Sequence, residues 1–215
     1  MLRDLIENAE QYFVRQKKEW TEILVDFETR NQYKILDVDK KEVGTISEVS
    51  SGIGGFLKRN FFGSHRSLDV RVHDADGSPV LRIERPFFFW FSSLEVKTEG
   101  GAGLGRVERR FGLIYKKYDL VDVNGRTFAK VSSPLWRLWT FPVRHTSGVG
   151  AAEISKKWGG ALREIFADAD TFRVAIEEGN WSGPERWVLF AAAISIDFDF
   201  FENNQGSGGL FSFFD

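Results

Sequence analysis

The residues that most often carry catalysis or metal binding are sparse in this chain. It contains no cysteine, which excludes a disulfide scaffold, a cysteine nucleophile and any thiolate metal site. Its histidines, His65, His73 and His145, fall in separate segments without the spacing of metal ligands. Ser155 and Ser195 lie in no nucleophile elbow. Because these residues form no triad or cofactor pocket, we do not expect an enzyme of covalent chemistry.

Aromatic and basic residues occur together and offer a different chemistry. The 215 residues include 21 Phe and 7 Trp, and segments 54–66, 82–94 and 132–146 combine such rings with seven basic residues against Glu84 alone. Rings settle at the headgroup level of a bilayer, and cations attract anionic lipids. The sequence therefore predicts a membrane-contact surface. Its predicted residues are Phe56, Phe61, Phe62, Phe87, Phe88, Phe89, Trp90, Phe91, Trp136, Trp139, Lys58, Arg59, Arg66, Arg85 and Arg137.

An alternative interpretation places the same rings in a core beneath long connections, since Phe is usually buried. Five consecutive rings at 87–91 cannot all face inward from one strand, which favours exposure of some of them. The net charge of −2 argues against a nucleic-acid partner. Membrane lipid is therefore the partner that this composition favours.

The elements that position these residues are short strands joined by turns. Segments 68–83 and 118–131 alternate apolar and polar residues on both sides of Asp76-Gly77 and Asn124-Gly125. These dipeptides predict type I′ hairpin turns, in which both central residues need positive φ. Between Tyr33 and Ser155 the chain therefore reads as successive antiparallel hairpins.

One long apolar run lies near the C-terminus, from Trp187 to Ile196. Extended to Phe201 it spans about 22 Å of helix, whereas a bilayer core needs about 30 Å. We expect this helix to be enclosed by a β-barrel, with Asp197 and Asp199 hydrogen-bonded where the helix leaves it. A short membrane span is the alternative. Enclosure predicts nearly complete burial of Trp187, Leu189, Phe190, Ala193 and Ile194.

Strand direction assigns the connections to the two ends of this barrel. If consecutive strands are antiparallel, the tight turns at 39–41, 75–78, 99–103 and 123–126 share one end. The connections at 50–67, 86–92, 111–114 and 133–139 then share the other. The second group carries the aromatic and basic residues, so we expect one mouth of the barrel to be aromatic and basic.

Several segments of the sequence resemble those of the phospholipid scramblase family, which shares the Tubby C-terminal fold. They are FETRNQYKI (27–35), RNFFGSHRSLDVRVHDADG (59–77), IERPF (83–87), ISKKWGGALREIFADADTF (154–172) and ISIDFDFFE (194–202). The resemblance implies a mainly β fold, an antiparallel β-barrel of about twelve strands that encloses a C-terminal hydrophobic helix at about 185–200. It implies one domain at 12–203, with a short tail at 1–11 and a Gly-rich tail at 204–215.

The function implied by the resemblance is bidirectional phospholipid translocation between leaflets. The alternative is a non-transporting scaffold module that binds anionic lipids or phosphoinositides, as Tubby-like domains do. Similar animal members carry acylated cysteine clusters in the connections that here read FLKRNFFG, RPFFFWF and PLWRLWTF. Encoded Phe, Leu and Trp residues thus stand where those members attach lipid, which supports membrane contact.

The resemblance also implies a calcium loop that begins at Asp168. Asp168 and Asp170 match its first two ligand positions, but Gly179 stands where a bidentate carboxylate is needed and Arg173 where an EF-hand needs glycine. Residues 172–176 alternate as a strand does. We expect at most a weak calcium site, with Asp168 and Asp170 mainly starting a strand or capping a turn. No other cofactor is expected.

The N-terminal residues offer no apolar segment of the kind found in signal peptides, because Arg3, Asp4, Glu7 and Glu10 interrupt them. We therefore expect a peripheral membrane or cytoplasmic protein, with the resemblance favouring the plasma membrane. The expected partners are phospholipid membranes that contain anionic lipids.

Overall fold

The computed structural model contains twelve strands and two helices in the residues that it describes, which are 1–16, 29–49, 67–88, 90–156 and 171–200. The helices are α1 (Leu2–Asn8) and α4 (Gly183–Phe200). The strands are β1 (Gln11–Gln16), β2 (Thr29–Leu36), β3 (Glu42–Val49), β4 (Leu68–Asp74), β5 (Pro79–Arg85), β6 (Ser93–Thr98), β7 (Gly103–Arg110), β8 (Tyr115–Asp122), β9 (Thr127–Pro134), β10 (Thr140–His145), β11 (Ala151–Ser155) and β12 (Thr171–Glu178).

The strands form one closed antiparallel barrel. Each strand pairs with its neighbours in sequence, and β1 closes the barrel by pairing with both β2 and β12. Tyr12 lies opposite Val174 at the closing seam. Closure gives each of the twelve described strands a neighbour on both sides. The predicted fold class, a mainly β barrel of about twelve antiparallel strands with a C-terminal helix, is confirmed.

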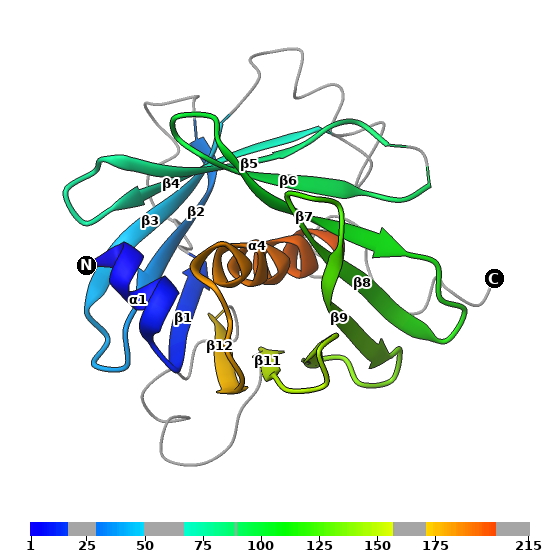
Figure 1. Ribbon diagram of the computed structural model, residues 1–215. Helices are drawn as coiled ribbons and strands as arrows, with labels where there is room; N and C mark the ends of the chain where they lie inside the picture. The colour runs from blue at the N-terminus through cyan, green and yellow to red at the C-terminus, as the bar shows by residue number, and fades with distance from the viewer. Residues whose placement is uncertain (17–28, 50–66, 89, 157–170, 201–215) are drawn as a thin grey trace.

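Helix α4 runs through the middle of this barrel (Figure 1). Leu189 and Phe190 are completely buried, and Trp187, Ala193 and Ile194 are at most 3% exposed, as predicted. A helix that is wrapped on every side needs no polar face, which explains the long apolar run that only Ser195 interrupts. In the described part of the chain, no helix is long and apolar enough to cross a membrane.

Five tight hairpin turns lie at one end of the barrel, which we call the turn end. They connect β2–β3, β4–β5, β6–β7, β8–β9 and β10–β11. In the β4–β5 turn, the Asp74 carboxylate accepts hydrogen bonds from the backbone N–H groups of Asp76 and Ser78, both at 3.0 Å. Gly77 alone has positive φ there, at 80°.

The type I′ prediction is therefore wrong for both Asp76-Gly77 and Asn124-Gly125. Only the glycine of each pair has positive φ, and the N–H of Gly125 bonds back to the carbonyl of Asp122. This geometry is a type I turn followed by a left-handed residue, which is the usual three-residue hairpin loop. The same left-handed position is taken by Lys40 in the β2–β3 turn, with φ 66°.

Helix α1 lies at the turn end beside the beginning of α4 (Figure 1). Its Leu2 and Ile6 belong to the hydrophobic core, so residues 1–11, expected as a tail, contribute packing. The Glu7 carboxylate accepts a 2.8 Å hydrogen bond from the Trp187 indole. A Cβ atom on Gly44 of β3 would lie 2.5 Å from the His73 carbonyl and 3.0 Å from Leu2, so glycine permits this close packing.

Candidate functional site

Large apolar side chains are exposed at the opposite end of the barrel, which we call the loop end. They come from the β5–β6, β7–β8 and β9–β10 connections, and Trp90 is the most exposed at 85%. Soluble proteins rarely leave such side chains together in water, because burying each one is worth about 1.5–3 kcal/mol. We call this set the apolar rim: Phe87, Trp90, Phe91, Phe111, Leu113, Ile114, Leu135 and Trp136.

Backbone contacts join the three connections into one surface. The N–H of Leu135 donates to the carbonyl of Ile114 at 3.1 Å, and the N–H of Arg109 donates to the carbonyl of Ser92 at 2.9 Å. The rings of Tyr115 and Trp136 pack 6.3 Å apart. The apolar rim is therefore held in place by the strands beneath it.

The described members of the predicted membrane-contact set differ in exposure. Phe87, Trp90, Phe91, Trp136 and Arg137 are exposed. Trp139 is half-buried. The remaining predicted positions, apart from Phe88 and Arg85, lie outside the described residues: Phe56, Lys58, Arg59, Phe61, Phe62, Arg66 and Phe89.

Phe88 and Arg85 contradict the prediction, because both are buried. Arg85 is only 2% exposed and continues the inward face of β5 after Leu81 and Ile83. Its guanidinium lies 5.2 Å from the centre of the Phe88 ring, which turns that ring toward the protein. Both side chains therefore stabilise the interior of the loop end.

Four members of the apolar rim were not predicted from the sequence: Phe111, Leu113, Ile114 and Leu135. Phe111, Leu113 and Ile114 could have been predicted, because strand direction already places residues 111–114 at this end of the barrel.

Charged side chains point into the barrel just below the apolar rim, where the alternating inward positions would otherwise be apolar. Lys116 shares the inward face of β8 with Tyr118 and Leu120, and Arg109 shares that of β7 with Val107. Lys156 follows the inward Ile154 of β11. We call Arg85, Arg109, Lys116 and Lys156 the cationic collar.

Asp199 of α4 binds part of this collar. Its carboxylate accepts hydrogen bonds from Arg85 at 3.1 Å and from the Tyr118 hydroxyl at 2.8 Å, and Arg109 lies 3.9 Å away. A buried carboxylate is tolerated only with such partners. Burial and the neighbouring Asp199 raise the pKa of Tyr118 well above its ordinary value, so the phenol remains a donor.

Asp197 binds the other side of the barrel in the same way. It accepts a 2.7 Å hydrogen bond from the Tyr33 hydroxyl, and the Lys156 ammonium lies 3.5 Å away. The prediction that Asp197 and Asp199 are hydrogen-bonded near the end of the helix is confirmed. Together they fix the C-terminal end of α4 to strands on opposite sides of the barrel.

Lys116 differs from the other collar cations, because its buried ammonium has no carboxylate partner among the described residues. It donates to the carbonyl of Arg137 at 3.3 Å and lies 4.8 Å and 4.9 Å from the ring centres of Phe141 and Phe200. Burial lowers its pKa to about 8, so the side chain is still mainly cationic at neutral pH.

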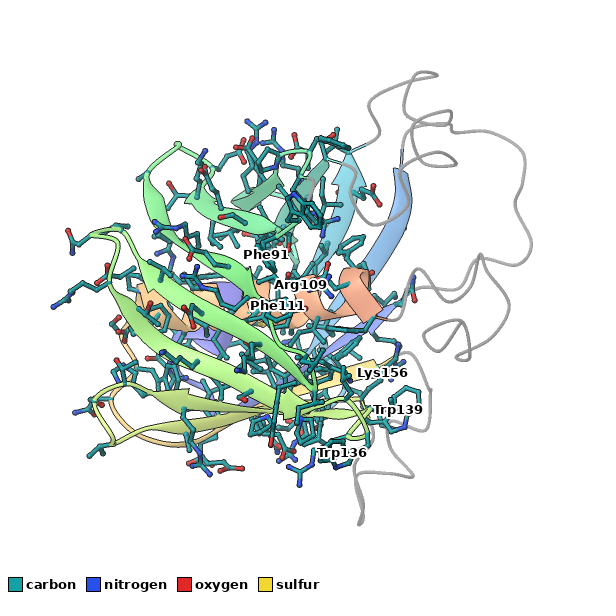
Figure 2. The ribbon with its side chains drawn as sticks, turned by 90° about the vertical axis from the view of Figure 1, so that its right-hand side faces the viewer. Phe91, Arg109, Phe111, Trp136, Trp139 and Lys156 are labelled. Carbon is teal, nitrogen blue, oxygen red and sulfur yellow. The ribbon has the colours of Figure 1, made fainter. Side chains whose placement is uncertain are left out.

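The loop end therefore combines exposed apolar side chains with cations directly beneath them. Arg85, Arg109 and Lys116 each lie two residues along the chain from the rim residues Phe87, Phe111 and Ile114. Figure 2 shows Phe91, Arg109, Phe111, Trp136, Trp139 and Lys156 gathered around the end of the barrel toward which α4 points. Such a surface can enter the headgroup region of a bilayer and attract phosphate.

A metal site is not found in the described residues, which contain no group of three or more His, Cys, Asp or Glu side chains suited to an ion. The predicted calcium ligands Asp168 and Asp170 lie outside the described residues.

Comparison with known proteins identifies relatives of this chain. The sequence model of the Scramblase family matches residues 2–203. The chain is 26% identical to "Altered inheritance rate of mitochondria protein 25" of Saccharomyces cerevisiae, covering 96% of this chain and 75% of that protein. It is 26% identical to phospholipid scramblase 1 of Mus musculus, covering 93% of this chain but only 63% of that protein. A solved Arabidopsis thaliana protein superposes with a TM-score of 0.49 at 11% identity, covering 90% of this chain and 93% of that one.

Proposed function

This chain belongs to the Scramblase family, and from that premise we propose that it docks on membranes through the apolar rim and moves phospholipids between the two leaflets. The observation that carries the proposal is the pairing of this exposed rim with the cationic collar at one end of the barrel. The exposed rim is not needed to close a barrel around an apolar helix, and the collar adds positive charge beneath it while it holds the end of α4. Both suit contact with a phospholipid headgroup layer.

The docked orientation follows from two forces that act together. Trp90, Phe111, Leu113 and Trp136 lose apolar contact with water when they enter the boundary between headgroups and acyl chains. Basic side chains near the surface add about 1 kcal/mol each on an anionic membrane. The loop end therefore faces the bilayer, and the turn end faces away from it.

Translocation then requires no covalent step, because the same lipid is substrate and product on opposite leaflets. The rim spreads the headgroups, and the collar offers cations to a phosphate that would otherwise meet only acyl chains. α4 stays inside the barrel, held by Asp197 and Asp199. The apolar rim, held by the barrel beneath it, thus perturbs the bilayer from its surface.

A fluorescent-lipid assay tests the proposal. The chain is reconstituted in liposomes with a labelled phospholipid, and dithionite quenching reports how quickly protected label reaches the outer leaflet. The wild-type chain should accelerate this exposure. A rim variant carrying Trp90→Ser, Phe111→Ser and Trp136→Ser should lose both binding and acceleration.

The turn end supplies the matched control, since Val38, Val123 and Val149 are also exposed apolar residues. Changing these three to Ser should alter neither binding nor lipid movement. Binding without accelerated quenching by the wild-type chain would instead support the non-transporting lipid-binding module. Equal activity of the rim variant would overturn the proposed docking.

A further inference from the structure

The geometry at the loop end points to a specific subsite: we infer that Lys116, with Arg109 beside it, binds the phosphate of a phospholipid headgroup. This inference rests on the proposed function and names the group that the docked protein would hold. It concerns two collar residues that are distinct from the exposed side chains of the apolar rim.

Lys116 is the collar cation whose charge the described residues leave uncompensated. Arg85 is paired with Asp199, and Lys156 lies beside Asp197. In the part of the chain that the structure describes, the Lys116 ammonium is surrounded by a neutral carbonyl and two ring faces. Because a buried cation is stabilised most by an anion, this position favours a negatively charged ligand.

The charges around Lys116 add to this preference. Arg109 on the neighbouring strand β7 lies over the same Phe200 ring, with 5.3 Å from its guanidinium carbon to the ring centre. Asp199 already bonds to Arg85 and Tyr118 and lies 3.9 Å from Arg109, so its charge is shared. On the other side, β9 places the neutral Ser133 opposite Lys116. The buried carboxylate of Glu48 is on β3, five strands away around the barrel.

The position of Lys116 fits a phosphate at headgroup depth. It follows the rim residue Ile114 by two positions, and its carbonyl partner Arg137 adjoins the rim residue Trp136. When the rim lies at the acyl boundary, Lys116 faces the layer that contains the lipid phosphates. A phosphodiester carries one negative charge, which matches one uncompensated ammonium. The apolar rim around it favours a lipid phosphate over dissolved phosphate.

Two adjacent lysines allow a matched test. Lys116 points inward, whereas Lys117 is exposed on the outer face of the same strand. We would measure binding of the full chain to vesicles of phosphatidylcholine and phosphatidylserine for wild type, Lys116→Met and Lys117→Met. Met keeps the length of the stem and its contact with the rings while removing the charge. Lys116→Arg, which keeps a cation, should retain binding.

The expected result is a loss of about tenfold in affinity for Lys116→Met, the size of one charge-assisted hydrogen bond. This loss should persist at high salt, because a buried contact is screened little, whereas any effect of Lys117→Met should disappear. Wild-type affinity should also fall as the pH rises above about 8, where Lys116 loses its proton. Lys116→Met should lack that step, and its thermal unfolding should show a folded protein.

Three outcomes would overturn the inference. Equal binding by Lys116→Met and Lys117→Met at all salt concentrations would remove Lys116 from the site. Failure of Lys116→Arg to bind while folded would show that charge is not what the position supplies. If inorganic phosphate displaced the wild-type chain from vesicles but did not displace Lys116→Met, the site would be assigned to free phosphate. In each case the variant with Trp90→Ser, Phe111→Ser and Trp136→Ser still tests the proposed function separately.

Discussion

The two ends of the barrel are built on opposite principles, although the same strands connect them. At the turn end, short loops satisfy their own backbone groups, as Asp74 and Asp122 each accept two N–H bonds in their turns. At the loop end, Trp90 and Leu113 are exposed to solvent, whereas Arg85 and Asp199 are buried. At the turn end, the exposed polar groups of the loops are hydrogen-bonded, whereas at the loop end large aromatic and aliphatic side chains are exposed.

This difference separates what the fold needs from what contact with a partner needs. Tight turns and the α1 packing on α4 are sufficient to close the turn end. The loop end exposes apolar area and buries charge, both of which oppose stability unless something compensates. A protein that departs from local rules in one place usually does so at a functional site. The turn end therefore serves the fold alone, whereas the loop end both stabilises the fold through its buried charges and carries the surface proposed to contact the membrane.

The largest expected effect tests the buried charge at the loop end. Asp199→Ala should lower the free energy of unfolding by about 3–5 kcal/mol, because it leaves the Arg85 charge buried without its partner. Tyr118→Phe removes only one hydrogen bond to the same carboxylate and should cost about 1–2 kcal/mol. Chemical denaturation of both variants measures the difference. An Asp199→Ala protein as stable as wild type would show that the collar is not a structural network.

The next effect contrasts two rings that lie two residues apart. Phe88→Ala should destabilise the protein by about 3 kcal/mol, since it opens a cavity beside Arg85. Trp90→Ser should leave thermal unfolding unchanged and weaken vesicle binding, because that ring is exposed. If Trp90→Ser also unfolds the barrel, the apolar rim is part of the core and the membrane assignment fails.

Arg85, which packs against Phe88, shows how much of this site could be predicted from the sequence. Local patterns predicted the barrel, because alternation and turn residues are visible within a dozen positions. The inward phase of Leu81 and Ile83 continues to Arg85, so its burial could have been predicted from β5 alone. Its partner Asp199 is 114 residues away, and no local pattern could pair them.

The turn type shows a different limit. Asp-Gly and Asn-Gly occur in both two-residue and three-residue hairpin loops, so the dipeptide does not decide between them. The deciding residue is Asp74 or Asp122 at the start of each loop, whose carboxylate holds the turn. Lys116 was missed for a related reason. A lysine between Tyr115 and Tyr118 looks like a surface residue until strand phase is fixed.

A smaller effect tests the turn end. Asp74→Ala should cost about 1 kcal/mol of stability, because it removes the acceptor for the N–H groups of Asp76 and Ser78. Asp74→Asn is the control and should recover most of that loss, since its amide oxygen can accept both bonds. Vesicle binding should be the same for all three proteins. A change in binding would contradict the division of roles between the two ends.

The smallest effect concerns Lys40, which occupies the left-handed position that Gly77 and Gly125 fill in other turns. Its φ of 66° costs about 1 kcal/mol for a residue with a Cβ atom. Glycine removes that strain but gains freedom in the unfolded chain, which returns about 0.5 kcal/mol. Lys40→Gly should therefore stabilise the protein by about 0.5 kcal/mol, or about 1–2 °C in Tm. Lys41→Gly is the matched control, because Lys41 has no positive φ and gains nothing to offset the lost entropy. Its Tm should fall. A lower Tm for Lys40→Gly as well would mean that the Lys40 side chain contributes more to the β2–β3 turn than its backbone strain costs.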